Sequence, residues 1–132
     1  MPSAEYREEE LPGLCAGDPR LSWMPMEAFE TLGACFHLCA QALAAGETVE
    51  TAGRIGYLLR GSGVVDGTVR PSGTLFGVKR EEYGRKISAP ASLVAREASI
   101  VLWMDFDAVR SVCYGACWFH VRLLREMDAL LG

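Results

Sequence analysis

The sequence predicts a single mainly β domain with flanking helices, and three observations lead to this prediction. Between residues 36 and 104 the apolar runs are short and glycines recur, which is typical of a β-sandwich or barrel because each strand must end in a tight turn. Asp66-Gly67 and Pro71-Ser72-Gly73 are strong turn signals within this region. After residue 105 the apolar residues recur at helical spacing. A chain of 132 residues is long enough for one domain to bury a core without staples.

The charge balance limits the partners of the chain. It contains 13 basic and 17 acidic residues, which gives a net charge of -4. General nucleic-acid binding needs a basic face that displaces phosphate counterions, whereas the basic residues here are scattered. We therefore expect no DNA binding by this chain alone. Half of the residues are apolar and 23% are charged, as in globular rather than disordered proteins.

The sequence shows no membrane span and no export signal, so we expect a cytoplasmic protein. The longest nearly uncharged apolar stretch, residues 31–46, is too short to cross a bilayer and includes polar residues. The first ten residues carry four Glu and one Arg, the reverse of a secretory signal. In the cytoplasm the five cysteines should be mostly reduced, and their odd number fits poorly with a disulfide framework.

The N-terminal quarter has two parts. Residues 1–25 contain four prolines and no clean hydrophobic period, so we expect an irregular arm with at most a short turn of helix. From residue 26 apolar residues recur every three positions, which predicts a short amphipathic helix. Pro25 suits the first turn of this helix, and Gly33 is its expected stop. The apolar residues of the helix are Met26, Phe29, Leu32 and Cys35.

Seven strands are expected next, because short apolar runs alternate with turn residues. They span residues 38–43, 48–50, 55–60, 63–65, 68–70, 92–96 and 99–104. The chain then becomes helical. Residues 106–112 form one expected helix with Asp105 as its N-cap, and Gly115 breaks it.

The terminal helix is expected over residues 116–131. Its apolar positions recur at intervals of three and four residues, which is the spacing of a narrow coiled-coil-like seam. These positions are Cys117, His120, Leu124, Met127 and Leu131. Such a seam fits a helix that associates with a second copy of the chain. An ordinary amphipathic helix packed on its own domain has the same pattern, because two heptads do not distinguish the two arrangements.

Several segments match short motifs in a fixed order. AAGETV at 44–49 corresponds to K-G-E-x-I, and Gly53 corresponds to the glycine of x-G-D. IGYLLRGSG at 55–63 corresponds to x-x-Y-x-L-x-G-x-V, and GTLFG at 73–77 corresponds to G-x-x-F-G. PASLVA at 90–95 and SIVLWMD at 99–105 correspond to the last two strands. Cys113 and the run Cys117-Trp118-Phe119-His120 are similar to the start of a bacterial regulator's dimerisation helix. Together, over roughly residues 29–132, these segments resemble the effector domain of Crp/Fnr-type transcription regulators.

The resemblance implies a fold and an assembly. The fold is a double-stranded β-helix, the jelly roll of cyclic-nucleotide-binding and cupin-like domains, followed by a C-terminal dimerisation helix. The chain then divides into the irregular arm, 1–25, and a β-roll domain, 26–132, with its C-terminal helix at 116–131. The family's helix-turn-helix domain is expected to be absent. The implied function is that of a sensory domain, homodimeric through the helix at His120, Leu124, Met127 and Leu131, that binds a small-molecule effector.

The ligand site is where the sequence departs from the family. In its cyclic-nucleotide-binding members, a Glu after the F-G turn holds the ribose hydroxyl and an Arg pairs with the cyclic phosphate, whose oxygens match a guanidinium. Here the Glu position is Val78, and the Arg position falls at about Ala89. We therefore expect a degenerate pocket without cyclic nucleotide, unless a shifted loop presents Arg85 or Lys86 to the phosphate. The expected pocket residues are Leu75, Phe76, Gly77, Val78, Arg85, Ala91 and Ser92.

Cysteine and histidine residues suggest a second function on the same fold. The candidates are Cys35, His37, Cys39, Cys113, Cys117 and His120. Such side chains are the usual zinc ligands, and a Cys–Cys pair can act as a redox switch. The alternative is that the cysteines are small buried hydrophobic residues. A third possibility, a small cupin-like enzyme, needs more histidines than the two present. No serine triad or phosphate loop appears, so we expect no enzyme activity and no cofactor, with zinc as the one candidate.

Overall fold

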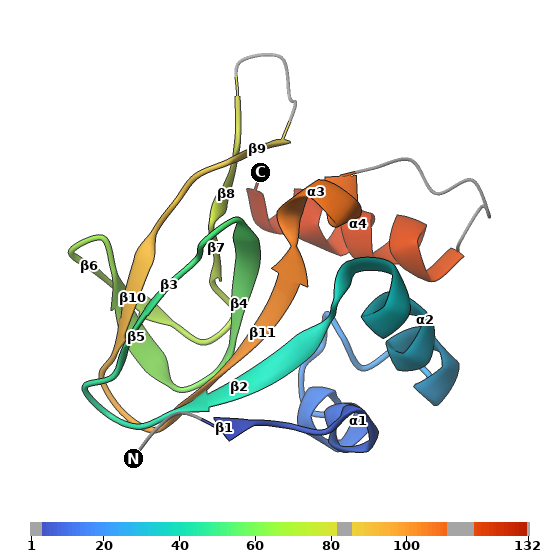
Figure 1. The fold of residues 1–132 in the computed structure, drawn as a ribbon, viewed down its shortest axis with the longest axis horizontal. Coiled ribbons are helices and arrows are strands. Elements are labelled where there is room, and N and C mark those ends of the chain that lie inside the picture. Colours follow the sequence, from blue (N-terminus) through green and yellow to red (C-terminus); the bar gives the residue numbers. More distant parts are fainter. Residues whose placement is uncertain (1–3, 82–85, 111–117, 132) are drawn as a thin grey trace.

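The computed structural model describes residues 4–81, 86–110 and 118–131, which form two antiparallel sheets packed face to face with helices on one side (Figure 1). The five-stranded sheet has the order β1-β2-β11-β4-β7, with strands Ala4–Glu5, Cys39–Leu43, Ser99–Asp105, Arg54–Arg60 and Leu75–Phe76. The four-stranded sheet has the order β3-β10-β5-β6, with strands Thr48–Glu50, Ser92–Ala95, Ser62–Val65 and Thr68–Pro71. A smaller pair joins β8 (Val78–Arg80) to β9 (Lys86–Ser88). The predicted fold class, a mainly β jelly roll with flanking helices, is confirmed.

The helices cover the outer face of the five-stranded sheet (Figure 1). They are η1 (Glu8–Glu10), α1 (Leu11–Cys15), α2 (Met26–Phe36), α3 (Phe106–Arg110) and α4 (Trp118–Leu131). The alternating side chains of the central strands explain this layering, because successive residues of a strand face opposite sides. Ile100, Leu102 and Met104 of β11 pack against the helices, whereas Val101 and Trp103 point between the two sheets. Strand β11 is therefore buried on both faces.

All seven strands expected from the sequence are present, each with ends within one residue of the predicted ends. The Asp66-Gly67 turn is also confirmed. Both residues have positive φ, 46° and 84°, and they join β5 to β6 with Val65 opposite Thr68. Two positive φ values in a two-residue loop match the right-handed twist of the paired strands. The strands missed by the sequence analysis are β1, β7, β8 and β9, which have only two or three residues each.

The N-terminal arm, which was expected to be irregular with at most a short turn of helix, contains two short helical segments and packs against the core. Residues 1–25 include β1, η1 and α1, and their apolar side chains Leu11, Cys15, Leu21 and Met24 are buried in the core beneath the helices. The hydroxyl of Tyr57 in β4 donates a hydrogen bond of 2.6 Å to Oδ2 of Asp18. Burial and this carboxylate raise the pKa of Tyr57. This hydrogen bond links the N-terminal arm to the five-stranded sheet.

Helix α2 does not stop at Gly33 as expected. It continues to Phe36, and His37 ends it in the left-handed conformation with φ of 58°. The peptide N–H of His37 donates to the Leu32 carbonyl, a common way to satisfy the last carbonyls of a helix. The extra turn buries Phe36 completely in the core. The benefit of burying this ring outweighs the poor helix propensity of glycine.

The C-terminal helices follow the sequence prediction more closely. Asp105 caps α3, because its Oδ2 accepts a hydrogen bond of 2.9 Å from the Ala108 N–H. Residues 111–117, which include the last two positions of the predicted first helix and the first two of the second, lie outside the described residues. Helix α4 packs against α2 and β7 of its own domain. No helix among the described residues is long and apolar enough to cross a membrane.

The face of α4 that packs on the domain includes part of the expected dimer seam. His120 and Met127 are buried, and Leu124 and Leu131 are partly buried against the same core. The structure thus has the intramolecular arrangement that the sequence left open for this helix. His120 and Met127 of the expected seam are therefore not available to a second copy, because they are buried in the core of their own chain. The large exposed apolar side chains of α4 are Val121 and Trp118, and the ring of Trp118 also meets the Trp23 ring edge to face at 5.6 Å.

Candidate functional site

A hollow of about 430 Å³ lies at one mouth of the β-roll, between the two sheets and the end of α4. Strands β5, β6 and β7, the start of β8 and the residues just before β10 build its walls, and the last turn of α4 closes one side. The residues that line it are Val65, Asp66, Arg70, Gly73, Thr74, Leu75, Phe76, Gly77, Val78, Ala89, Ala91, Leu130 and Leu131. An occupant would therefore touch the roll and the terminal helix together.

The hollow contains most of the residues expected to form a pocket. Leu75, Phe76, Gly77, Val78 and Ala91 line it. Ser92 is outside the lining, and its backbone N–H donates to Asp66 Oδ1 at 3.2 Å, while Arg85 lies outside the described residues.

Sequence reasoning missed the charged rim and the helical wall. Asp66 and Arg70 are the charged residues among the described lining, and both are exposed. Asp66 gave a signal only as a turn residue, and Arg70 gave none. Leu130 and Leu131 come from the end of α4, more than 50 residues after the F-G turn that they approach. No spacing rule along the chain could bring those positions together.

The two positions at which the Glu and the Arg of a cyclic-nucleotide pocket were expected from the sequence are apolar. Val78 is buried, and Ala89 lies opposite Gly77, with its N–H donating to the Gly77 carbonyl at 3.0 Å. A phosphate placed between them would lose its hydration without gaining a guanidinium from either position. Desolvating an unpaired anion is strongly unfavourable. The described walls therefore suit uncharged groups, and the charges stay at the rim.

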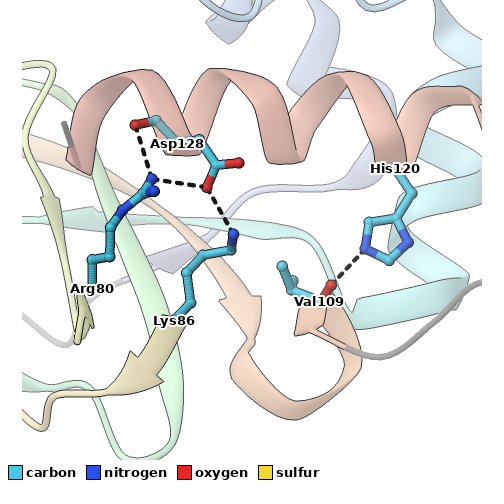
Figure 2. A network of polar contacts seen from close by, with 5 residues as sticks. All are labelled: Arg80, Lys86, Val109, His120 and Asp128. Carbon is cyan, nitrogen blue, oxygen red and sulfur yellow. Dashed lines mark hydrogen bonds and ion pairs between the residues drawn. The ribbon is translucent and has the colours of Figure 1, made fainter. Parts of the chain in front are cut away.

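Lys86 is already engaged elsewhere. Its Nζ lies 2.7 Å from Oδ1 of Asp128 in α4, and Nη2 of Arg80 lies 3.3 Å from the same oxygen and from the Asp128 carbonyl oxygen (Figure 2). One carboxylate thus links both strands of the β8–β9 pair to the terminal helix. The alternative in which Lys86 pairs with a bound phosphate is not the arrangement seen, because its ammonium points to Asp128. The contact holds the end of α4 beside the hollow.

The described cysteines and histidines are not brought together as a metal site. Among the described residues, no group of three or more His, Cys, Asp or Glu side chains could hold a metal ion. Cys35 and His37 are exposed, whereas His120 is buried, with Nε2 donating to the Val109 carbonyl oxygen at 2.6 Å (Figure 2). Its ring lies 5.4 Å from that of Phe36, so His120 is a hydrogen-bonded core residue. The four candidates that the structure describes, Cys35, His37, Cys39 and His120, therefore do not form a metal-binding cluster among themselves.

The thiols of Cys15 and Cys39 have raised pKa values and are therefore poor nucleophiles at neutral pH. Burial, followed by a hydrogen bond to Glu5, raises the pKa of the Cys39 thiol to about 11. Burial raises the pKa of the Cys15 thiol to about 12. Both thiols are thus protonated at neutral pH, and the thiolate is the reactive species. Cys113 and Cys117, which the redox prediction also needs, lie outside the described residues.

The fold and the position of the hollow define the structural class of this domain. The two facing antiparallel sheets, the F-G turn at the mouth and the closing C-terminal helix together form the jelly roll of cyclic nucleotide-binding domains. The chain is similar to a cyclic nucleotide-binding domain from Methylobacillus flagellatus KT, with a TM-score of 0.58 and 16% identity over 98% of this chain and 81% of that one.

Two ion-channel domains are similar as well. The cyclic-nucleotide binding homology domain of a KCNH channel has a TM-score of 0.50 and 17% identity, over 86% of this chain and 90% of that one. The C-linker/CNBHD of zELK channels has a TM-score of 0.50 and 16% identity, over 88% of this chain and 63% of that one. No family model and no curated protein matches the sequence. The structural likenesses establish the fold.

Proposed function

We propose that this chain is a cytoplasmic sensory domain of the Crp/Fnr regulator type, and that it binds a small effector other than a cyclic nucleotide. The observation that supports this most directly is the position of the hollow between the roll and the end of α4. An effector bound there contacts Leu130 and Leu131, so its binding energy depends on where the helix lies. A ligand shifts a conformational equilibrium only through such differential contacts. The chain would act by binding, not by catalysis.

The walls of the hollow indicate the chemistry of the effector. Phe76, Val78 and Ala91 offer apolar contact, and the charged groups Asp66 and Arg70 lie at the rim. Binding sites of this kind are mostly apolar, with a few polar groups that fix orientation. We infer a small, largely apolar molecule with a polar end that reaches the rim. The similar structure from Methylobacillus flagellatus KT is described as a cyclic nucleotide-binding domain. In this chain Val78 and Ala89 stand where the resemblance expects the Glu and the Arg of such a site.

A thermal-shift titration tests the ligand class, since a molecule that binds only the folded state raises the unfolding midpoint. We expect cyclic AMP and cyclic GMP to leave the midpoint of the native chain unchanged. The matched variant Val78→Glu/Ala89→Arg restores the carboxylate and the guanidinium, and we expect its midpoint to rise with cyclic nucleotide. A saturable rise for the native chain would refute the degenerate pocket. An apolar fragment that stabilises the native chain but not Ala89→Trp, which fills the hollow, would support the proposed effector site.

We also propose that two copies associate through the outer face of α4. Trp118 and Val121 are 59% and 48% exposed and lie one helical turn apart, so they form one apolar surface. Exposed aromatic residues of this kind are enriched at protein interfaces. This surface replaces the expected seam through His120 and Met127, which are buried in their own domain.

Analytical ultracentrifugation over a concentration series tests this association. We expect a concentration-dependent dimer that Val121→Asp weakens by at least about tenfold, because a buried charge at an interface costs more than 1.4 kcal/mol. Leu124→Asp, at the partly buried edge of the same helix, should also weaken it. The control is Val69→Asp on β6, another exposed valine, which should leave the dimer unchanged. A native chain that stays monomeric at high micromolar concentration would refute the dimer.

A further inference from the structure

A second hollow, of about 280 Å³, lies on the inner side of the five-stranded sheet near its β1 edge. Its lining consists of Glu5, Cys39, Gln41, Arg54 and Trp103, so each residue brings a polar group to the site. None of these five residues lines the effector hollow described above. The two hollows therefore have separate linings, although Trp103 of this one packs against Phe76 of the other with ring centres 5.6 Å apart.

The positive group of this hollow is held in a fixed place. The guanidinium carbon of Arg54 lies 4.1 Å from the centre of the Trp103 ring, and Arg54 Nε donates to the Thr51 carbonyl oxygen at 3.3 Å. Trp103 is only 1% exposed, and its Nε1 donates to Gln41 Oε1 at 2.8 Å. Stacking and hydrogen bonding thus orient the guanidinium before any ligand arrives.

Arg54 retains donors for a ligand. In the described part of the chain, no carboxylate lies within ion-pair distance of its guanidinium, and its one hydrogen bond uses Nε alone. The two terminal nitrogens form a planar fork whose geometry matches a carboxylate. Preorganised, half-buried donors of this kind bind an anion better than a mobile surface arginine does, because less side-chain entropy is lost on binding.

The negative group of the hollow is Glu5, which is exposed on β1. It accepts a hydrogen bond from the Cys39 thiol, and this thiol stays protonated at neutral pH for the reasons given above. The lining therefore carries one positive and one negative charge, with the amide of Gln41 and the thiol of Cys39 as neutral polar groups. A simple anion would meet the repulsion of Glu5, and a simple cation would meet that of Arg54.

We propose that this hollow binds a small zwitterion of the amino-acid class, with its carboxylate on Arg54 and its ammonium group on Glu5. Each charge of such a ligand meets an opposite charge of the lining, and neither is left unpaired. The volume of the hollow suits a molecule of a few heavy atoms. The indole of Trp103 stacks on Arg54 and donates a hydrogen bond to Gln41, so its N–H resonance reports whether a ligand occupies the hollow.

The experiment follows the indole N–H resonance of Trp103 by NMR in the full chain during titration with glycine, β-alanine and γ-aminobutyrate. These three zwitterions differ in the separation of their charges, and acetate and methylammonium are the matched single-charge probes. We expect a saturable shift with at least one zwitterion, and at least about tenfold weaker binding of acetate and methylammonium. The thermal midpoint should rise with the same zwitterion. No saturable response to any of the three, or equal binding of acetate, would overturn the proposal.

Variants separate the two charges. Arg54→Gln should abolish binding of the zwitterion, and Arg54→Lys should restore part of it, because an ammonium keeps the charge but not the planar fork. Glu5→Gln should remove the preference for the zwitterion over acetate. The control is Arg60→Gln, an exposed arginine at the other end of β4, which should bind like the native chain. Because the Arg54 change alters the surroundings of Trp103 itself, its binding is also measured by the rise of the thermal midpoint. Unchanged binding in Arg54→Gln would refute the site.

Discussion

Replacing Gly77 with alanine is expected to lower the free energy of unfolding by about 2–5 kcal/mol, the combined cost of a left-handed backbone and an overpacked contact. Gly77 has φ of 85°, and a Cβ at this position would lie 2.5 Å from the Arg54 carbonyl oxygen and 2.9 Å from Thr51 Cγ2. The first neighbour is backbone within β4 and cannot turn away. Urea unfolding followed by circular dichroism measures the loss.

A matched control separates the two contributions. Gly46 has nearly the same φ, 87°, but nothing lies within 4 Å of a Cβ built there. Gly46→Ala should therefore cost about 1–2 kcal/mol, the backbone contribution alone. Equal losses for the two variants would show that the close approach to Arg54 is not what requires glycine at position 77. The comparison bears on function because Gly77 lines the effector hollow and its carbonyl accepts the Ala89 N–H across the mouth.

The sequence was sufficient for features that depend on neighbouring residues. The Asp66-Gly67 hairpin, the Asp105 cap and the strands around Tyr57 and Trp103 follow from local turn chemistry and alternation, which are encoded within a few positions. The F-G turn motif likewise predicted Phe76 and Val78 as pocket residues, and both line the hollow. These features were recovered because no distant contact decides them.

The features that were missed depend on contacts between distant segments. Gly33 was expected to end α2, but the burial of Phe36 in the assembled core extends the helix by another turn. Asp128 pairs with Arg80 and Lys86 across more than 40 residues, and the spacing of α4 alone does not show this. Glu5 and Arg54 likewise share a hollow only because β1 joins the sheet edge beside β2. Tertiary packing thus decides both the helix ends and the polar sites.

The second prediction concerns the packing of α4 on its own domain. Met127→Asp is expected to lower the free energy of unfolding by about 3–5 kcal/mol, because the methionine packing is lost and a carboxylate is buried without a partner. Met127 is 2% exposed and lies in the core cluster formed with α2, β4 and β11. The matched control is Val121→Asp on the same helix, where the side chain is half exposed and the cost should stay within about 0.5 kcal/mol.

The pair of variants distinguishes the two arrangements that the sequence left open for this helix. If α4 packs on its own domain, Met127→Asp destabilises the monomer in urea unfolding, whereas Val121→Asp changes only the monomer–dimer equilibrium. If the helix instead used the seam of His120, Leu124, Met127 and Leu131 for dimerisation, Met127→Asp would dissociate the dimer and leave the unfolding of the monomer unchanged. That outcome would also remove Leu130 and Leu131 from the wall of the effector hollow. The stability of the Met127 variant therefore tests the fold of the helix and the proposed sensory mechanism together.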